Sequence, residues 1–561
     1  MSESIKVGDL VAQFLKEIGV TTAFGVISVH NIPILDAIGR GNLLRFVMAR
    51  GEAGAGHMAD AYARASGGLG VLFSSTGPGA ANACGALVEA RFAGAPVLHL
   101  TGQTATGNID RHQGTVHDVS DQLGMLTSVS KAAYRVRSPE TALGTLIQAA
   151  ATALTPPKGP VSVEIPIDIQ RAEVPRPAEL DHLVLPIPAP PAPHDDALEA
   201  LADRVAAAKR PLLWTGNGAT HARDAVLKLI DLGIPHVTSW NGRGVVPEDN
   251  PMTLGSLNGN GTPDILEFYK TVDLLIVAGS RLRGHETADM SLGLPENRVQ
   301  IDIDPRANGR TYSSELFVCA DSALTLDALA GRLAGRLDIA PGYGEELAEL
   351  KPRTTEAYRK AQAPYDTFPT DLRAAMPDDA IFVRDITLAN STWGNRIFPL
   401  NDPSQNIYPV GAAIGPGMQL GIGAALGGGG RKVVCMCGDG GFFLNLTELW
   451  TAVQEQVDVV FMVMNDKGYG VIRHIQDTLY GGRKFFHDLQ GPDLESLAGV
   501  AGLNYARVAK ASELGDKVAT ALAVSGPSLI EVDMEAIGPY PPYFKPPPYA
   551  QKSDDKAAAD D

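Results

Sequence analysis

The sequence has few cysteines and no long apolar runs. Only four cysteines occur among 561 residues, and Cys435 and Cys437 sit in the apolar run 433–437, where neither a disulfide nor a C-x-x-C metal spacing can be argued. No uninterrupted apolar stretch reaches the roughly 18 residues of a membrane span, and residues 1–8 lack the basic and apolar regions of a signal peptide. We therefore expect a protein of the reducing cytoplasm, with no membrane partner.

Runs of basic residues are also absent. Acidic residues number 64 against 47 Lys and Arg, which gives a formal net charge of −17, and no basic cluster would follow a phosphate backbone. This argues against nucleic acid as a partner. The remaining composition, 45% hydrophobic and 20% charged, is ordinary for a globular protein, and the length predicts about three to four domains.

Alternating apolar and helical patterns predict α/β units. Apolar runs at 70–73, 96–100 and 160–165 alternate with helical patterns such as 7–18, which is typical of a parallel sheet built from βαβ units. Two further sets of apolar runs repeat the pattern, at 211–215, 272–277 and 298–303, and at 432–437, 457–464 and 528–532. The fold class is therefore predicted as α/β, with three doubly wound parallel-sheet domains.

Proline marks the predicted divisions. Residues 176–194 are rich in proline and cannot hold a regular helix or a central strand, so we interpret them as a linker. The predicted domains are then 1–175, a central domain at 195–345 and a third at 346–537. Residues 538–561 form a Pro- and Tyr-rich arm with an acidic tail. The arm is either a lid over a site or a plain surface arm, and the last eleven residues should be disordered.

A Gly-Asp-Gly motif follows the predicted strand 432–437. In Gly438-Asp439-Gly440, the glycines permit a tight turn and the acid projects at the carboxyl edge of the sheet, where phosphates bind. One predicted helix and strand later, the segment 464–470 returns the chain to the same edge. Magnesium prefers oxygen ligands and commonly shares them with a diphosphate. Asp439 with Asp466 or Asn465 would supply half of such a coordination shell.

These motifs resemble those of the thiamine diphosphate enzymes of the acetolactate synthase, benzoylformate decarboxylase and benzaldehyde lyase group, and the resemblance covers residues 5–540. It implies that Mg²⁺ is bound by Asp439, by Asp466 in place of the family's asparagine, and by the carbonyl of Gly468. It also implies a set of residues that bind thiamine diphosphate: Gly438, Asp439, Gly440, Gly441, Asp466, Gly468, Tyr469 and Gly470 in the third domain, and Gly77, Pro78 and Asn82 in the first.

Two more cofactor residues come from the same resemblance. The segment 51–64 is similar to the family's glutamate helix, which implies that Glu52 hydrogen-bonds a pyrimidine nitrogen and promotes removal of the thiazolium C2 proton. The segment 415–426 is similar to one whose large apolar residue supports the bent cofactor, which implies that role for Met418. The structural alternatives are a helix N-terminal carboxylate and a core methionine.

Histidines mark the expected substrate side. Residues 24–30 are similar to a benzaldehyde lyase segment whose histidine faces the thiazolium, which implies that His30 relays a hydroxyl proton. His112 and His117 lie in a segment where related enzymes place polar active-site residues, and His112 matches a pyruvate decarboxylase position. We count all three histidines as candidate catalytic residues beside Glu52, with ordinary structural or surface roles as the alternatives.

The departures from the family bear on specificity. Phe73 stands where benzoylformate decarboxylases place a catalytic histidine, and Ile475 where acetolactate synthases have a substrate-selecting tryptophan. Residues 279–286 replace the arginine-rich flavin segment, which argues against FAD, and FAD is kept only as an alternative further cofactor.

We predict a carboligase or lyase that makes or cleaves a carbon–carbon bond beside a carbonyl group in 2-oxo acids, aldehydes or 2-hydroxy ketones. The alternatives are an acetolactate synthase-like enzyme or 2-oxo acid decarboxylase, a flavin-dependent oxidase, and a non-catalytic cofactor-binding scaffold. The family implies a homodimer or homotetramer with shared active sites.

Overall fold

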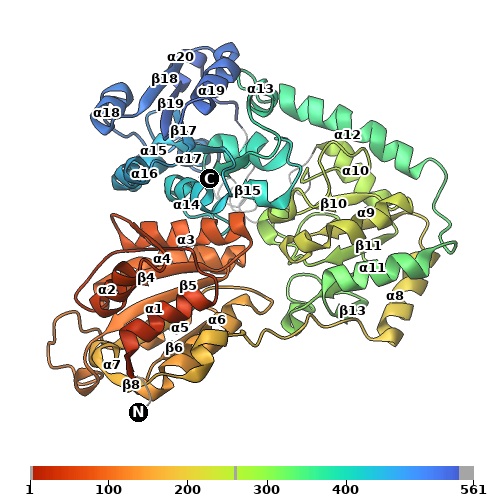
Figure 1. Ribbon diagram of the computed structural model, residues 1–561. Helices are drawn as coiled ribbons and strands as arrows, with labels where there is room; N and C mark the ends of the chain where they lie inside the picture. Colours follow the sequence, from red (N-terminus) through yellow and green to blue (C-terminus); the bar gives the residue numbers. More distant parts are fainter. Residues whose placement is uncertain (1–3, 258–261, 543–561) are drawn as a thin grey trace, which may run out of the picture.

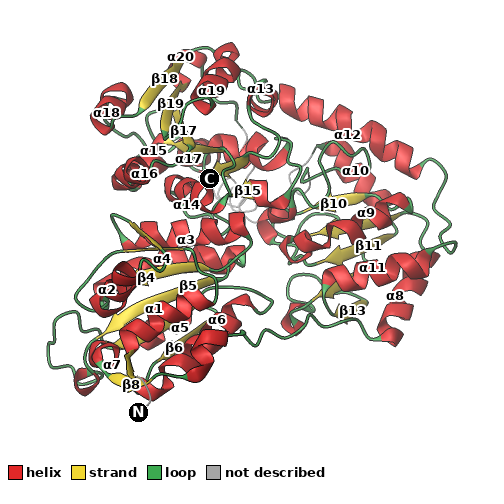
Figure 2. Ribbon diagram, viewed as in Figure 1, coloured by secondary structure: helices red, strands yellow, loops and turns green. Residues whose placement is uncertain are grey.

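The structure is a computed structural model that describes residues 4–257 and 262–542. It contains three parallel β-sheets, each with helices on both faces, and one small antiparallel pair formed by β1 (Ser4–Lys6) and β8 (Glu173–Pro175) (Figure 2). The predicted fold class, α/β with doubly wound parallel sheets, is confirmed. The residues at which one unit passes into the next stay predictions. The acidic tail, most of the predicted arm and residues 258–261 lie outside the described part of the chain.

The first unit is a six-stranded sheet in the order β3-β2-β4-β5-β7-β6. Its strands are β2 (Thr22–Gly25), β3 (Arg45–Met48), β4 (Gly70–Ser74), β5 (Val97–Gln103), β6 (Ala132–Arg135) and β7 (Val161–Pro166). Its helices are α1 (Val7–Glu17), α2 (Ile32–Gly41), α3 (Glu52–Ser66), α4 (Pro78–Ala93), α5 (Gln122–Val129), α6 (Ala142–Leu154) and α7 (Ile167–Arg171). Apolar residues of α1, α2 and α6 pack on one face of the sheet and those of α3, α4 and α5 on the other.

The central unit is a five-stranded sheet in the order β10-β9-β11-β12-β13. Its strands are β9 (Pro211–Thr215), β10 (His236–Thr238), β11 (Leu274–Ala278), β12 (Arg298–Asp302) and β13 (Leu316–Cys319). Its helices are α8 (Asp195–Ala207), α9 (Arg223–Asp231), α10 (Pro263–Thr271), α11 (Ser322–Leu333) and the long α12 (Tyr343–Lys360), which leads to the third unit (Figure 1). The predicted linker before it contains one short 3-10 helix, Ala178–His182.

The third unit is a six-stranded sheet in the order β15-β14-β16-β17-β19-β18. Its strands are β14 (Ile381–Arg384), β15 (Asn406–Ile407), β16 (Val433–Gly438), β17 (Val459–Asn465), β18 (Asn504–Val508) and β19 (Ser528–Asp533). Its helices are α13 (Phe368–Ala375), α14 (Gly417–Gly427), α15 (Asp439–Leu444), α16 (Leu449–Glu455), α17 (Gly470–Leu479), α18 (Leu494–Ala501), α19 (Leu514–Leu522) and α20 (Met534–Ile537). After α20, the buried Tyr540 stacks on Tyr365 with ring centroids 4.8 Å apart, so the start of the predicted arm packs on this unit.

The first and third units share one hydrophobic core. In Figure 1 the third unit lies over the first, with α14 above α3, while the central unit lies beside both. Glycines on α14 allow a close approach, since a Cβ at Gly423 would lie 2.2 Å from the carbonyl oxygen of Met58. Apolar residues of α3, α4, α14 and β16 consequently form a single cluster. No helix in the described ranges is long and apolar enough to cross a membrane.

Candidate active site

Three loops gather at the carboxyl edge of the third sheet. They follow β14, β16 and β17, which are neighbours in the sheet, so side chains at their ends converge. β16 ends at Gly438, and Asp439 begins α15. β17 ends at Asn465, directly before Asp466.

The carboxyl groups of Asp439 and Asp466 meet at this edge. They lie within hydrogen-bonding reach of each other, and Asp439 also accepts backbone N–H groups of Gly440 and Gly468. Burial, reinforced by the charge of Asp466, raises the pKa of Asp439 to about 7, and burial also raises the pKa of Asp466. Oδ1 of Asp439 is buried and has no hydrogen-bond partner. Two facing carboxylates with an unsatisfied buried oxygen fit a divalent cation of oxygen preference.

The glycines of the two motifs leave room for these contacts. A Cβ at Gly440 would lie 2.7 Å from a ring carbon of Tyr469, and one at Gly470 would lie 2.2 Å from Oδ2 of Asp466. A Cβ at Gly441 would lie 2.6 Å from Oδ2 of a third acid, Asp385. Any larger residue at these positions would therefore push the loops apart.

Asp385 belongs to the site although sequence reasoning missed it. This fully buried side chain follows β14 and accepts backbone N–H groups of Gly415 at 3.1 Å and Gly417 at 3.2 Å. Burial raises the pKa of Asp385 to about 6. The carboxylate thereby positions the turn into α14, and no local sequence pattern marks an acid whose partners lie 30 residues further along.

Two further polar contacts surround Asp466: Asn465 binds Glu531, and Arg473 binds Asp466 itself. Nδ2 of Asn465 donates a hydrogen bond to Glu531 at 2.6 Å. Of the two candidate metal ligands, Asn465 and Asp466, it is therefore Asp466 that faces Asp439. Arg473 on α17 donates to the carbonyl of Asp466 at 3.1 Å, and its guanidinium lies 3.8 Å from the Asp466 carboxylate. The acidic pair therefore has one positive charge beside it.

Glu52 is the first residue of α3 and is buried. Its Oε2 accepts Nδ2 of Asn82, on α4, at 3.1 Å, and a Cβ at Gly79 would lie 2.5 Å from its Oε1. Gly77 precedes Pro78 at the start of α4 and has a positive φ of 57°, which glycine adopts readily. The structure thus brings together Glu52, Asn82 and the Gly-Pro-Gly turn.

Gln122 supports this turn and was also missed. Its Oε1 accepts the N–H of Gly77 at 2.7 Å, while its Nε2 donates to the buried Glu164 at 2.9 Å. Glu164 in turn pairs with Arg135. A lone glutamine in sequence gives no signal for such a role.

His30 and His117 form a pair. Their Nδ1 atoms are 3.4 Å apart and their ring centroids 5.2 Å, and a Cβ at Gly102 would lie 2.5 Å from the Cβ of His30. Partial burial, with the charges of His117 and Arg171, lowers the pKa of His30. His112 is exposed, with a φ of 52°, and within the described residues no hydrogen bond or ring contact joins it to the pair.

Met418 and Ile414 differ in accessibility. The Met418 side chain is 1% exposed and lies in the shared core, whereas Ile414, directly before Gly415, is 43% exposed. Of the two, Ile414 presents the accessible apolar surface.

Comparison with known proteins agrees with this geometry. The family described as thiamine pyrophosphate enzyme matches in three parts: the N-terminal TPP binding domain over residues 5–125, the central domain over 198–329, and the C-terminal TPP binding domain over 389–532.

Named relatives span most of the chain. It is 31% identical to a probable 2-ketoarginine decarboxylase of Pseudomonas aeruginosa over 84% of each chain. It is 28% identical to a probable acetolactate synthase large subunit of Methanocaldococcus jannaschii, over 96% of this chain and 94% of the relative. It is 27% identical to acetolactate synthase isozyme 1 large subunit of Escherichia coli, over 94% of each.

The chain belongs to the thiamine pyrophosphate enzyme family. It is a thiamine diphosphate-dependent enzyme that acts as a carboligase or a lyase, as the sequence predicted.

Proposed function

We propose that this enzyme uses thiamine diphosphate with Mg²⁺ to make or cleave a carbon–carbon bond beside the carbonyl group of a 2-oxo acid, aldehyde or 2-hydroxy ketone. The observation that carries the proposal is the buried Asp439–Asp466 carboxyl pair with the unsatisfied Oδ1 of Asp439. The names of the relatives, a 2-ketoarginine decarboxylase and acetolactate synthases, support chemistry on 2-oxo acids.

Asp439, Asp466 and the carbonyl of Gly468 would hold the metal ion, whose charge would offset that of the diphosphate. Gly438, Gly440, Gly441, Tyr469 and Gly470 would surround the phosphate groups, and the N-terminus of α17 begins at Gly470. When bound, thiamine diphosphate supplies an electron sink for the carbonyl carbon of the substrate.

In the first unit, Glu52 would bind the pyrimidine, with Asn82, Gly77 and Pro78 forming the wall around it. Its side-chain hydrogen-bond partner in the described structure is the neutral amide of Asn82. A buried carboxyl group in that setting can both give and take a proton. Ile414, rather than the buried Met418, is then our candidate for the apolar support of the bent cofactor.

His30 and His117 would move the substrate's hydroxyl proton. The lowered pKa of His30 leaves its imidazole neutral at physiological pH, so it can accept a proton, and the adjacent His117 can pass the proton on. His112 stays a prediction as a catalytic residue, and its exposure favours a surface role.

The proposed assembly is a homodimer or homotetramer with shared active sites. Large apolar side chains of α4, α15 and α16 are partly exposed in the single chain, namely Val88, Phe92, Leu444 and Trp450, and they offer a surface for a second copy. Sedimentation equilibrium should give at least twice the chain mass of 59.1 kDa. A monomer that binds the cofactor fully would contradict shared sites. The cytoplasmic location stays a prediction.

The test of the function is a product assay by proton NMR. The enzyme with thiamine diphosphate and Mg²⁺ is incubated separately with pyruvate, benzoylformate, 2-ketoarginine, benzaldehyde and benzoin. Aldehyde and carbon dioxide from an oxo acid would define a decarboxylase, a 2-hydroxy ketone would define a carboligase, and benzaldehyde from benzoin a lyase. No turnover across a broader panel of 2-oxo acids and 2-hydroxy ketones would contradict the proposal.

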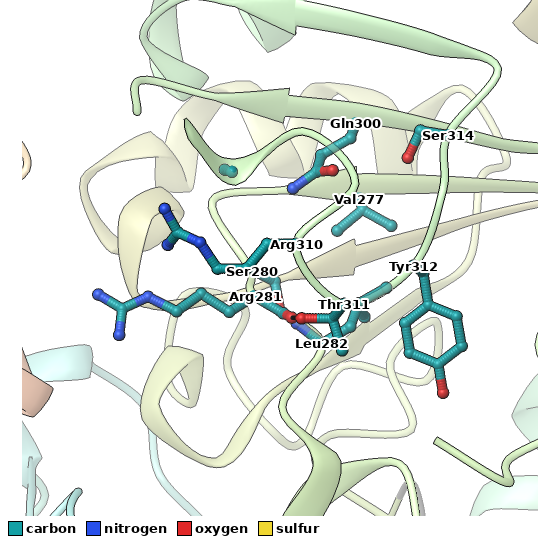
Figure 3. A pocket seen from close by; sticks show the side chains of 10 residues that line it. Val277, Ser280, Arg281, Leu282, Gln300, Arg310, Thr311, Tyr312 and Ser314 are labelled. Carbon is teal, nitrogen blue, oxygen red and sulfur yellow. Dashed lines mark hydrogen bonds between the residues drawn. The ribbon is translucent and has the colours of Figure 1, made fainter. Parts of the chain in front are cut away.

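A flavin-dependent oxidase is the second candidate, because two arginines lie together beside a small pocket of the central unit. It lies at the carboxyl ends of β11 and β12 and is lined by Val277, Ser280, Arg281, Leu282, Gln300, Ala307, Arg310, Thr311, Tyr312 and Ser314. Figure 3 shows the guanidinium groups of Arg281 and Arg310 pointing the same way, away from Tyr312, where they could bind phosphates. Visible flavin absorption of the purified protein tests this candidate, and a colourless active enzyme would exclude it.

A further inference from the structure

Two buried glutamates connect the first and third units. One belongs to the third unit and binds the backbone of the first, and the other belongs to the first unit and binds the backbone of the third. Glu448 directly precedes α16 in the third unit, and Glu89 lies on α4 in the first. Both are almost fully buried, and each accepts backbone N–H groups of the other unit. A buried carboxylate bound to backbone N–H groups fixes the chain that donates them, because moving that chain would leave a desolvated charge without partners.

Glu448 binds the backbone at the start of the Glu52 helix. The N–H of Arg50 donates to its two carboxylate oxygens at 3.0 and 3.2 Å, and the N–H of Gly51 donates as well. A Cβ at Gly54 would lie 2.2 Å from Oε1 of Glu448, so the helix and the carboxylate fit closely. Glu448 therefore fixes the first turn of α3, from which the side chain of Glu52 projects.

Glu89 of the first unit binds the backbone of a third-unit loop, the one that contains Ile414. The N–H groups of Gly411 and Ala413 donate to its carboxylate at 2.7 and 2.8 Å. On the other side of Ile414, Asp385 binds the N–H groups of Gly415 and Gly417. The backbone on both sides of Ile414 is thus bound, by Glu89 of the first unit on one side and by Asp385 of the third unit on the other.

We propose that Glu448 and Glu89 are reciprocal positioning residues: the third unit places Glu52 through Glu448, and the first unit places Ile414 through Glu89. The inference rests on the proposed function for the roles of Glu52 and Ile414. It extends that function by making the contact between the two units within one chain a part of cofactor activation.

The test compares Glu448→Gln and Glu89→Gln with a matched control, Glu455→Gln. Glu455 also joins the two units, through its ion pair with Arg45 at 2.5 Å, but it touches neither site segment. Hydrogen exchange followed by mass spectrometry on the protein without cofactor gives the first readout. We expect Glu448→Gln to increase exchange in residues 48–54 and Glu89→Gln in residues 409–417, with the rest of each variant unchanged.

The second readout is the rate at which the holoenzyme exchanges the C2 proton of thiamine diphosphate for deuterium. Misplacing a reacting group by about 1 Å can cost roughly a hundredfold in rate, so we expect the smaller displacement in each variant to slow the exchange by about tenfold or more, with wild-type rates in Glu455→Gln. Gly54→Ala, which displaces the Glu448 carboxylate without removing its charge, should slow the exchange too.

The outcomes separate the two proposals. Unchanged local hydrogen exchange, or C2 exchange within about twofold of wild type in both glutamine variants, would overturn the positioning role. Equal slowing in Glu455→Gln would overturn it as well. If the wild-type protein itself does not accelerate C2 exchange over free cofactor, the proposed function fails, and the positioning role is then judged by the hydrogen-exchange readout alone.

Discussion

At the residue scale, the acids of the site are bound mainly by neutral groups. Glu52 accepts the amide of Asn82, and Asp385 accepts backbone N–H groups. In Asp439 and Asp466, two carboxyl groups face each other with Arg473 at the edge of the pair. Neutral donors hold a carboxylate in place without placing the charge of a bound cation beside it.

Glu52→Gln tests the activating acid. The amide has the same shape but cannot transfer a proton to or from the pyrimidine nitrogen, so turnover should fall by about 10²-fold or more. Circular dichroism and the melting temperature should stay close to wild type, since Asn82 can still donate to the remaining oxygen. Near wild-type turnover of the purified variant would disprove the assigned role.

A pair of alanine variants separates Ile414 from Met418. Met418 is 1% exposed in the core, so Met418→Ala should lower the free energy of unfolding by about 2–5 kcal/mol. Ile414 is 43% exposed, so Ile414→Ala should cost little stability but weaken cofactor affinity and turnover. Cofactor titration by tryptophan fluorescence, with thermal unfolding in parallel, measures both. The reverse pattern would restore Met418 as the cofactor support.

The sequence revealed the residues of this site that stand in glycine-rich motifs, and it missed those that act through distant backbone. Asp439, Asp466 and Glu52 each follow or precede glycines that a strand-to-helix turn needs. Asp385, Gln122 and Glu448 show no such local pattern, because their partners lie 30, 45 and 398 residues away in the chain.

At the scale of elements, the sequence predicted most of the inner strands of the three sheets, and it missed the edge strands together with the inner strands β2 and β14. Predicted runs correspond to β4, β5 and β7, to β9, β11 and β12, and to β16, β17 and β19, which are inner strands of their sheets. Inner strands of a parallel sheet are buried on both faces and form continuous apolar runs. Edge strands such as β6 (Ala132–Arg135) are half-buried along their whole length, so their residues are mixed and resemble loops.

The end of β5 gives a prediction at this scale. A methyl group at Gly102 would lie 2.5 Å from both the Cβ and the carbonyl oxygen of His30. Gly102→Ala should therefore displace the His30 loop from His117 and lower turnover by about tenfold or more. The control is Gly144→Ala on α6, where a Cβ meets nothing within 4 Å, and which should keep its activity. Equal activity of the two variants would show that the histidine pair is not needed.

At the scale of the whole molecule, the first and third units behave as one packed body. Their apolar residues form a single core, and Arg64 of α3 donates to the carbonyl groups of Tyr408 and Asn406. Asp60, one turn before Arg64, is fully buried, and its Oδ1 has no hydrogen-bond partner. The stability of the assembled units should therefore depend on the ionisation of this one acid.

The sign of that dependence follows from the pKa of Asp60. Burial raises it to about 6, and Arg64 at 3.9 Å compensates only in part, whereas an unfolded aspartate has a pKa of about 3.9. The folded state favours the neutral form, so its stabilising contribution is complete below about pH 4 and is lost as pH rises through about 6. Asp60→Asn cannot ionise, so its stability relative to wild type should increase by about 1 kcal/mol between pH 5 and pH 8. Melting temperatures of both proteins at the two pH values measure this, and a difference that does not change with pH would mean that Asp60 is already ionised in the folded protein at pH 5.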